Sequence, residues 1–206
     1  MQWIYLSKNG TDEYINRMAQ GAGVIPTPIE SWNYDENPSS GIVLRGIMKH
    51  KLMKQCWADG RRFRYMDTGY FGNRPGVRNP QGWKHWHRVV DNDLQHNRVL
   101  SRPSDRWERL GIKRHPWNRT GRNILIVAPD EKPCVFYDTT LDQWINQTVD
   151  LIKQHTDRPI IIRHRNPEVI KQNRLIESSF EAALTNAWAV VTFNSNAGTE
   201  SILAGV

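Results

Sequence analysis

Short apolar runs separated by helical patterns dominate the last third of the chain. The runs cover residues 124–128, 160–163 and 189–193, with stretches long enough for helices between them. Apolar runs of strand length that alternate with helices are typical of a parallel sheet with helices on its faces. We therefore predict an α/β domain whose third strand leads, through a small polar stretch, into another helix.

The first of these helices has the clearest pattern. Its apolar residues recur at the spacing of one helix face, and Thr140 with Gln143 forms the pattern of a capping box. The face consists of Leu141, Trp144, Ile145, Val149 and Ile152. The pattern predicts a helix that begins at residue 141 and ends before the next strand at Ile160.

The first half of the chain repeats this organisation less regularly. Helices are predicted at 12–20 and 47–58, and strands at 3–6, 41–46, 63–67 and 89–90. Glycines, prolines and polar residues mark a long loop at 24–40, an irregular stretch at 69–81 and a connector at 102–121. We predict two Rossmann-like α/β halves with parallel sheets, residues 1–110 and 111–206. The last helix is barely two turns long at Val206, so we expect the second half to be incomplete.

Composition narrows the class of protein. Hydrophobic residues make up 38% and charged residues 24%, which is typical of a folded globular chain. The two cysteines lack the spacing of a metal or redox motif, and no stretch reads as a signal peptide or a membrane span. We expect a cytoplasmic protein with reduced thiols and no membrane partner.

Positive charge is concentrated between residues 45 and 88. This segment holds eleven basic residues against two acidic ones, and seven aromatic residues lie among them. Cations interleaved with aromatic side chains attract phosphates and stack on bases, which favours a nucleic-acid surface. The candidate contacts are Arg61, Arg62, Arg64, Trp83 and Trp86. The alternative is a solvated basic face over an ordinary aromatic core.

The segment from Val190 to Val206 resembles the donor-site stretch of glycosyltransferases with the GT-B architecture, including capsule-type and bacteriophage members. In that family a strand ends in a small polar loop, and the next helix carries an acid before an apolar-Gly-Val turn. The resemblance implies a nucleotide-sugar site, with a UDP-linked sugar as co-substrate and no other cofactor. It implies contacts to the diphosphate or ribose from Asn194, Ser195, Asn196, Thr199 and Glu200. Hydroxyls and N–H groups at a helix start suit phosphate oxygens, and a carboxylate one turn further can accept from a diol. The alternative is a capped surface helix.

Two further arginines follow the second strand of this half. Arg163 and Arg165 lie where ligands bind in such sheets, and in the GT-B family a basic residue at this place often meets the pyrophosphate. Alternatively, they are solvent-facing partners of acidic neighbours.

Candidate bases for sugar transfer lie in the first half. Asp67 ends a predicted strand before a glycine-rich turn, where it could accept the acceptor's proton or merely cap the turn. His87 is a second candidate. His85 and His87 have no acidic or cysteine partners nearby in sequence, so we predict no metal site.

Two functions follow from these patterns. The first is a glycosyltransferase that moves a sugar from a nucleotide-sugar to an acceptor, with a hydroxylated base in phage DNA as one candidate acceptor and a capsule or teichoic-type polymer as another. The second is a non-catalytic nucleic-acid-binding protein that uses the α/β half only as a scaffold. A nucleotide-sugar epimerase on the same fold is a third possibility.

Overall fold

A computed structural model describes residues 2–70, 87–96, 101–164 and 179–206. The chain divides into two compact units, residues 1–99 (unit 1) and 100–206 (unit 2), each described by itself below. The expected boundary lay after residue 110, so the short helix α3 (Asp105–Leu110) groups with unit 2 rather than unit 1.

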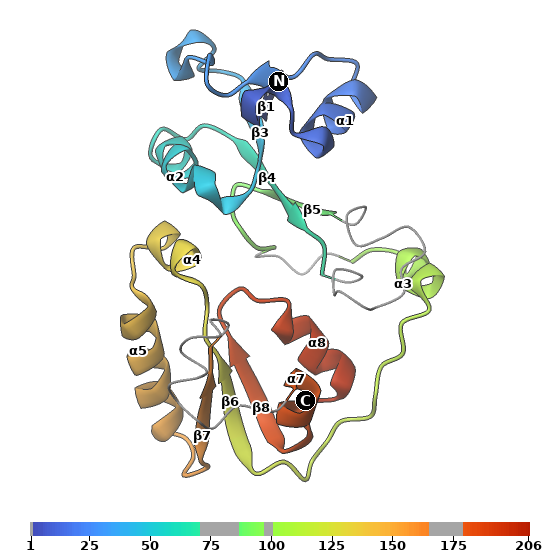
Figure 1. Cartoon of the computed structure of the whole chain (residues 1–206), viewed down its shortest axis with the longest axis vertical. Helices are drawn as coiled ribbons and strands as arrows, with labels where there is room; N and C mark the ends of the chain where they lie inside the picture. The colour runs from blue at the N-terminus through green and yellow to red at the C-terminus, as the bar shows by residue number, and fades with distance from the viewer. Residues whose placement is uncertain (1, 71–86, 97–100, 165–178) are drawn as a thin grey trace. The chain divides into compact units, whose positions relative to one another are not determined.

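Unit 1 is a five-stranded sheet with helices on both sides (Figure 1). Its elements in chain order are β1 (Trp3–Ser7), η1 (Lys8–Gly10), α1 (Glu13–Gly21), β2 (Thr27–Pro28), η2 (Tyr34–Glu36), β3 (Gly41–Arg45), η3 (Ile47–Lys49), α2 (His50–Ala58), β4 (Phe63–Thr68) and β5 (His87–Asp91). The strand order is β2-β1-β3-β4-β5. The first four strands are parallel, and β5 pairs with β4 in the antiparallel direction.

Alternation along the strands of unit 1 supplies apolar side chains to both faces of the sheet. Tyr5, Val43 and Met66 face α1 and form a core cluster with Ile15 and Ala19 of that helix. On the opposite face, α2 buries two side chains and places Trp57 6.3 Å from the ring of Phe63. Burial on both faces explains why the central strand β3 reads as an unbroken apolar run.

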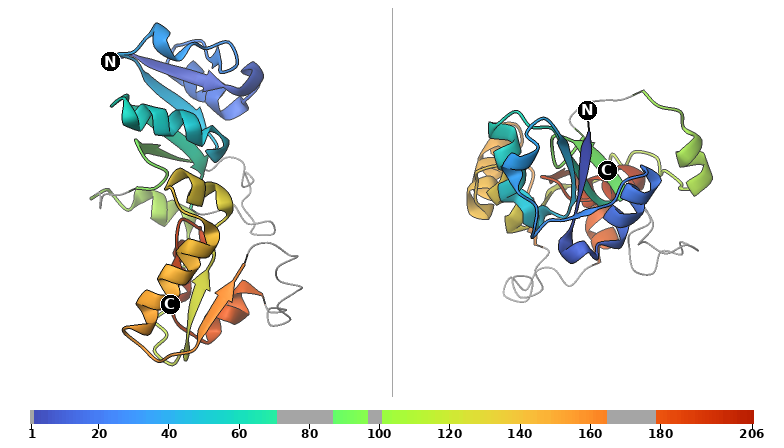
Figure 2. Two further views of the ribbon diagram at one scale, coloured as in Figure 1. Left: turned by 90° about the vertical axis from the view of Figure 1, so that its left-hand side faces the viewer. Right: turned by 90° about the horizontal axis from the view of Figure 1, so that it is seen from above.

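Unit 2 is a three-layer arrangement around a smaller sheet (Figures 1 and 2). After α3 it contains β6 (Asn123–Val127), α4 (Glu131–Phe136), α5 (Leu141–Lys153), β7 (Ile160–Arg163), α7 (Phe180–Thr185), β8 (Ala187–Thr192) and α8 (Ala197–Ala204). The strands are parallel and follow the order β7-β6-β8. Figure 1 shows α5 on one side of this sheet and α7 and α8 on the other, where Leu125, Leu184 and Ala187 form a core cluster.

Capping side chains set the starts of two helices, one of them at the predicted capping box. The side chain of Asp12 accepts hydrogen bonds from the backbone of Tyr14 and Ile15, so α1 begins directly after it. The capping box at Thr140 and Gln143 is present in full and starts α5.

Four elements differ from the sequence prediction. One is the helix α3, which lies inside the stretch predicted as a connector. The short helix α4 was not predicted; its Pro133 is tolerated because it sits in the first turn, where a backbone N–H has no helical partner. The two-residue strand β2 lies inside the stretch predicted as loop. The prediction of parallel sheets is confirmed for four strands of unit 1 but not for the fifth, because β5 is antiparallel.

The irregular segment 112–122, which we call the strap, is fastened to unit 2 by its backbone. The N–H groups of His115, Asn118 and Arg122 donate to the carbonyl oxygens of Leu203, Gly205 and Asn186 at 2.8, 2.6 and 2.9 Å. The predicted connector is therefore an ordered part of unit 2. None of the helices in the described parts of the chain is long and apolar enough to cross a membrane.

Candidate functional site

The strand order of each unit marks one place where a ligand could bind. In both units the first strand lies between the second and the third, as β2-β1-β3 and β7-β6-β8. In open parallel sheets ligands bind beyond the carboxyl ends of the strands, where the chain changes from one side of the first strand to the other. These switch points lie after β1 and β3 in unit 1 and after β6 and β8 in unit 2.

The turn from β8 to α8 forms the switch point of unit 2. The strand ends at Thr192 and the helix begins at Ala197, which confirms the predicted strand-to-helix turn. Ser195 sits on this turn and partly caps the helix, because its hydroxyl accepts from the N–H of Ala197 at 3.2 Å and its carbonyl accepts from the N–H of Gly198 at 3.2 Å. Two of the helix's first N–H groups are therefore already bonded within the turn.

The remaining predicted donor residues lie on the same turn and helix. Asn194 and Asn196 are half-buried within the turn, and Thr199 and Glu200 are half-buried in the first turn of α8. The structure thus brings these side chains to one edge of the sheet together with Ser195. A helix start with amide, hydroxyl and carboxylate groups can bind phosphate oxygens and a vicinal diol.

The packing of α8 against β8 requires a glycine at position 198. A Cβ at this position would lie 2.9 Å from the Cγ2 methyl of Thr192, closer than side-chain packing allows. The glycine lets α8 approach β8. This packing contact accounts for the glycine without a bound phosphate.

Three aromatic rings lie beside this turn, and the sequence patterns did not point to them as site residues. Phe193, which directly precedes the polar residues, packs edge-on against Tyr137 at 5.3 Å and at a tilt against Trp144 at 5.6 Å between ring centroids. All three are half-buried, whereas Phe136 beneath Tyr137 is fully buried. Partly exposed rings at a nucleotide site could stack on a base.

Arg163 ends β7 at the same edge of the sheet as the β8–α8 turn. Its guanidinium lies 5.8 Å from the centre of the Phe180 ring, and its carbonyl accepts from the N–H of Ala128. This position suits a cation that contacts an anionic ligand. Arg165 lies outside the described residues.

The corresponding edge of unit 1 carries a carboxylate of the chain itself. Oε2 of Glu30 accepts from the N–H of Asn9, in the loop after β1, at 2.8 Å. Desolvation raises the pKa of Glu30, but the backbone N–H groups of Glu30 and Asn9 and the charges of Lys49 and Lys8 together lower it. Because an internal anion already holds this loop, the switch point of unit 2 is the better candidate for an anionic ligand.

Asp67 belongs to a hydrogen-bonded group at the end of β4. Its carboxylate accepts from the hydroxyl of Tyr65 and from the N–H of Thr68, and the Arg88 guanidinium lies 3.8 Å away. Burial, followed by the neighbouring Asp67 charge, raises the pKa of Tyr65, so this phenol stays protonated and continues to donate. Asp67 is about one-third exposed, so a substrate hydroxyl could still reach it.

His87, the other predicted base, does not share a face with Asp67. In the β4–β5 register Asp67 pairs with Arg88 and Thr68 pairs with His87, and neighbouring strand residues point to opposite sides. The His87 ring lies 4.0 Å from that of Tyr14, which also carries the Arg45 guanidinium at 4.6 Å. The two candidates are therefore alternatives rather than an acid–base pair.

Arg61, predicted to bind nucleic acid, is only 7% exposed. Its guanidinium donates to the carbonyl oxygens of Ser40, Tyr34 and Asn37 at 2.9, 2.5 and 2.7 Å and lies over the rings of Trp32 and Tyr34. These contacts hold the loop before β3 in place. We therefore leave Arg61 out of any ligand surface.

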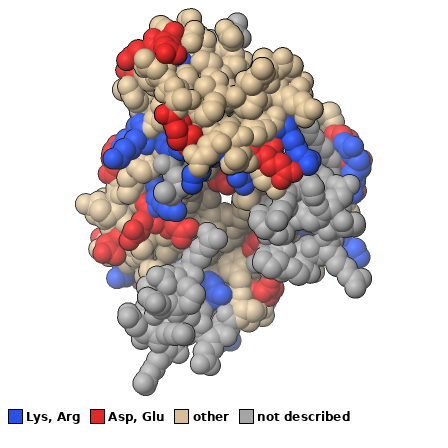
Figure 3. Space-filling model, turned by 45° about the horizontal axis from the view of Figure 1, so that its top comes forward, with Lys and Arg blue, Asp and Glu red and all other residues tan. Residues whose placement is uncertain are grey.

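Other arginines of the predicted basic segment have acidic or aromatic partners. Arg62 and Arg64 lie over the ring of Trp3, and Arg64 also pairs with Asp91 at 3.0 Å. Arg45 pairs with Asp12 at 3.4 Å. On the face in Figure 3, basic and acidic side chains are interspersed rather than forming one basic field. Trp83 and Trp86 lie outside the described residues.

Among the described residues, the count of charges between positions 45 and 88 left out acids that pair with two of the arginines. The acids that pair with Arg45 and Arg64 are Asp12 and Asp91, which fall outside that window of sequence. Strand pairing and the capping of α1 bring them together.

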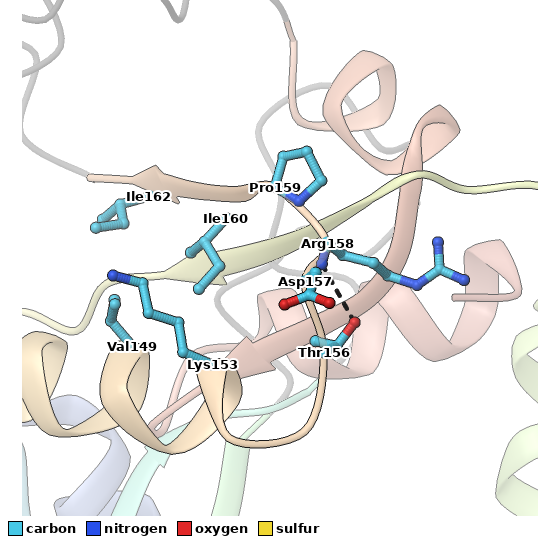
Figure 4. Close-up of a pocket in the computed structure, with 8 residues that line it drawn as sticks. All are labelled: Val149, Lys153, Thr156, Asp157, Arg158, Pro159, Ile160 and Ile162. Atoms are coloured by element: carbon cyan, nitrogen blue, oxygen red, sulfur yellow. Dashed lines mark hydrogen bonds between the residues drawn. The ribbon is translucent and has the colours of Figure 1, made fainter.

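A groove of about 580 Å³ opens at the other edge of unit 2, between α5 and β7 (Figure 4). Val149, Ile160 and Ile162 supply its apolar wall. It lies toward the amino end of β7, away from the predicted donor residues at the carboxyl ends of the strands. The groove is therefore distinct from the switch point.

Comparison with known proteins adds no assignment: no family model, no curated protein and no solved structure matches the chain.

Proposed function

We propose that the protein is a glycosyltransferase that takes its sugar from a nucleotide-sugar, and that unit 2 binds this donor. The observation that carries the proposal is the position of the residues from Asn194 to Glu200. They lie on the turn after β8 and in the first turn of α8, at the switch point of a parallel sheet. In folds of this kind that position is where nucleotides bind.

Each part of the donor has a suitable partner near this turn. Asn194, Ser195 and Asn196 offer hydrogen bonds to the diphosphate, and Glu200 can accept from the ribose hydroxyls. The half-buried ring of Tyr137, beside the turn, offers a stacking face for the base. The diphosphate would compete for the N–H groups that Ser195 now satisfies, and bonds to a charged group are stronger than those neutral ones.

The transfer step requires a base and a stabilised leaving group. As the acceptor hydroxyl attacks the anomeric carbon, its proton passes to a carboxylate or imidazole, and the bond from that carbon to the diphosphate breaks. Arg163 stabilises the charge that develops on the diphosphate. In unit 1, Asp67 serves as the base, held by Tyr65 and Arg88, and His87 is the alternative.

Nucleotide binding tests the proposal. We expect UDP to bind the complete protein in calorimetry, and Glu200→Ala to weaken this binding by about 1.5–3 kcal/mol, the range for a hydrogen bond that involves a charged group. The matched control is Asp150→Ala, which removes an exposed carboxylate from α5 of the same unit. It should leave the affinity unchanged.

Two outcomes of this experiment would contradict the proposal. If neither UDP nor any other nucleoside diphosphate binds, unit 2 is not a donor domain. If nucleotides bind but Glu200→Ala and Asp150→Ala behave alike, the ribose is not held by Glu200. The release of sugar from UDP-sugar by the wild type can be compared with that of Asp67→Asn and His87→Gln. The variant that abolishes this release identifies the base.

A further inference from the structure

The strap carries the densest exposed group of cations in the described parts of unit 2. Between residues 111 and 129 there are four basic side chains and no acidic one. These four, Lys113, Arg114, Arg119 and Arg122, are all exposed, and none makes an ion pair within the described residues. In this they differ from Arg45, Arg64 and Arg88 of unit 1, whose charges face carboxylates.

An aromatic side chain stands among these cations. Trp117 is 57% exposed, which is unusual for a tryptophan because burying it would be strongly favourable. Its position in the middle of the strap puts basic residues on both sides of it in sequence. An exposed ring flanked by cations offers a stacking face and charge attraction together.

The backbone of the strap is already ordered. Besides its three backbone hydrogen bonds to unit 2, the side-chain amide of Asn118 donates to the carbonyl of Thr185 at 3.2 Å. Gly121 lies so close to β8 that a Cβ there would be 2.1 Å from the carbonyl oxygen of Ala187. Binding would therefore not have to order this segment first, which removes one cost of association.

A second exposed tryptophan lies next to the strap. Trp188 follows Ala187 in β8 and is 41% exposed, with the Arg158 guanidinium 4.1 Å from its ring centre. Arg158 also donates to the carbonyl of Gly121 at 3.4 Å, which ties the loop before β7 to the strap. Figure 4 shows the Arg158 side chain extending away from the groove residues Ile160 and Ile162. The exposed carboxylate of Asp157, on the same loop, offsets one of the positive charges of Arg158 and the strap.

We propose that the strap binds single-stranded nucleic acid, with Trp117 stacking on a base and the four cations contacting the phosphates. Single strands fit better than a duplex, because only an unpaired base presents its face to a ring. The surface belongs to the amino-end edge of the sheet, since it lies beside the starts of β6 and β8, whereas the proposed donor site lies at their carboxyl ends. The proposal goes beyond the proposed sugar transfer and does not depend on it.

Fluorescence anisotropy with a labelled oligothymidine tests this surface. If four phosphates are contacted, the logarithm of the affinity should fall against that of the salt concentration with a slope of about −3, from about −0.7 per contact on single strands. Replacing Lys113, Arg114, Arg119 and Arg122 together by Gln should bring the slope close to zero and weaken binding at least about tenfold at 0.1 M salt. Trp117→Ala should weaken binding roughly 5- to 150-fold, and Trp117→Phe should restore most of it.

A matched variant distinguishes the effect of the strap cations from the effect of the protein's net charge. Arg17, Lys51, Lys132 and Lys153 are exposed cations on other elements, and changing all four to Gln alters the net charge equally. It should leave oligothymidine binding nearly unchanged. Equal losses in the two quadruple variants would overturn the proposal. The proposal would also be overturned if Trp117→Ala left oligothymidine binding unchanged and heparin bound as tightly as oligothymidine, since a general polyanion surface would behave in this way. UDP binding by the strap variant should stay at the wild-type level, so a failed donor site and a failed strap give different results.

Discussion

Replacing Arg61 by Lys tests whether this arginine supports the fold rather than a ligand. The change keeps the positive charge, so an interaction with phosphates that depends on charge alone would largely survive. It removes the planar donor set, which reaches the carbonyls of Ser40, Tyr34 and Asn37 together. Lysine can satisfy only one of these acceptors well.

The expected loss follows from those contacts. A hydrogen bond to a charged group contributes about 1.5–3 kcal/mol, so losing two of the three would cost about 3–6 kcal/mol. The lower end applies, because Asn37 is exposed and the carbonyls of Tyr34 and Asn37 can regain water. The remaining ammonium also keeps part of the attraction to the rings of Trp32 and Tyr34. We expect Arg61→Lys to lower the free energy of unfolding of unit 1 by about 3 kcal/mol.

Urea denaturation followed by far-UV circular dichroism measures this difference, with the transition of each unit fitted separately. Arg62→Lys is the control, because Arg62 is the exposed neighbour of Arg61 and its guanidinium lies over the ring of Trp3 at 5.5 Å. It should change the stability by less than about 0.5 kcal/mol, as surface substitutions usually do. The reasoning is refuted if Arg61→Lys is as stable as Arg62→Lys.

Two further predictions concern packing and thiols. Gly121→Ala should destabilise unit 2 by about 3 kcal/mol or more in the same urea experiment, because the added Cβ would collide with the backbone of β8. Gly21→Ala is the control: no atom lies within 4 Å of the added Cβ, so this change should be neutral or slightly stabilising. Burial raises the pKa of the Cys56 and Cys134 thiols. Both should therefore resist iodoacetamide at pH 8.5 in the folded protein and react once the protein is unfolded in urea, with the modified thiols counted by mass spectrometry. Modification of either thiol in the native state would contradict their burial.

The sequence predicted the elements whose signals are local. Apolar runs located β3, β6, β7 and β8, and the capping box located the start of α5, because period and caps are properties of neighbouring residues. The strand-to-helix turn after β8 was predicted for the same reason. The helix α4 was missed because six residues containing a proline resemble a loop.

Contacts between distant strands were beyond such patterns. A short apolar pair at Val89–Val90 indicates a strand but neither its direction nor its register. The antiparallel register of β5 puts Arg88 opposite Asp67 and sends His87 to the other face, which changes the reading of both candidate bases. Likewise, the cation that satisfies three carbonyls of the 34–40 loop cannot be told from its exposed neighbour by composition alone.

The strap also changes how unit 2 can open. Irregular surface segments usually open first, because few contacts hold them and their amides exchange with solvent at little cost. Here the N–H of Asn118, in the strap, bonds to the carbonyl of Gly205, directly after α8. Peeling away either segment exposes the bonded groups of the other, so both must open together. The strap and the end of α8 therefore open as one cooperative unit rather than separately.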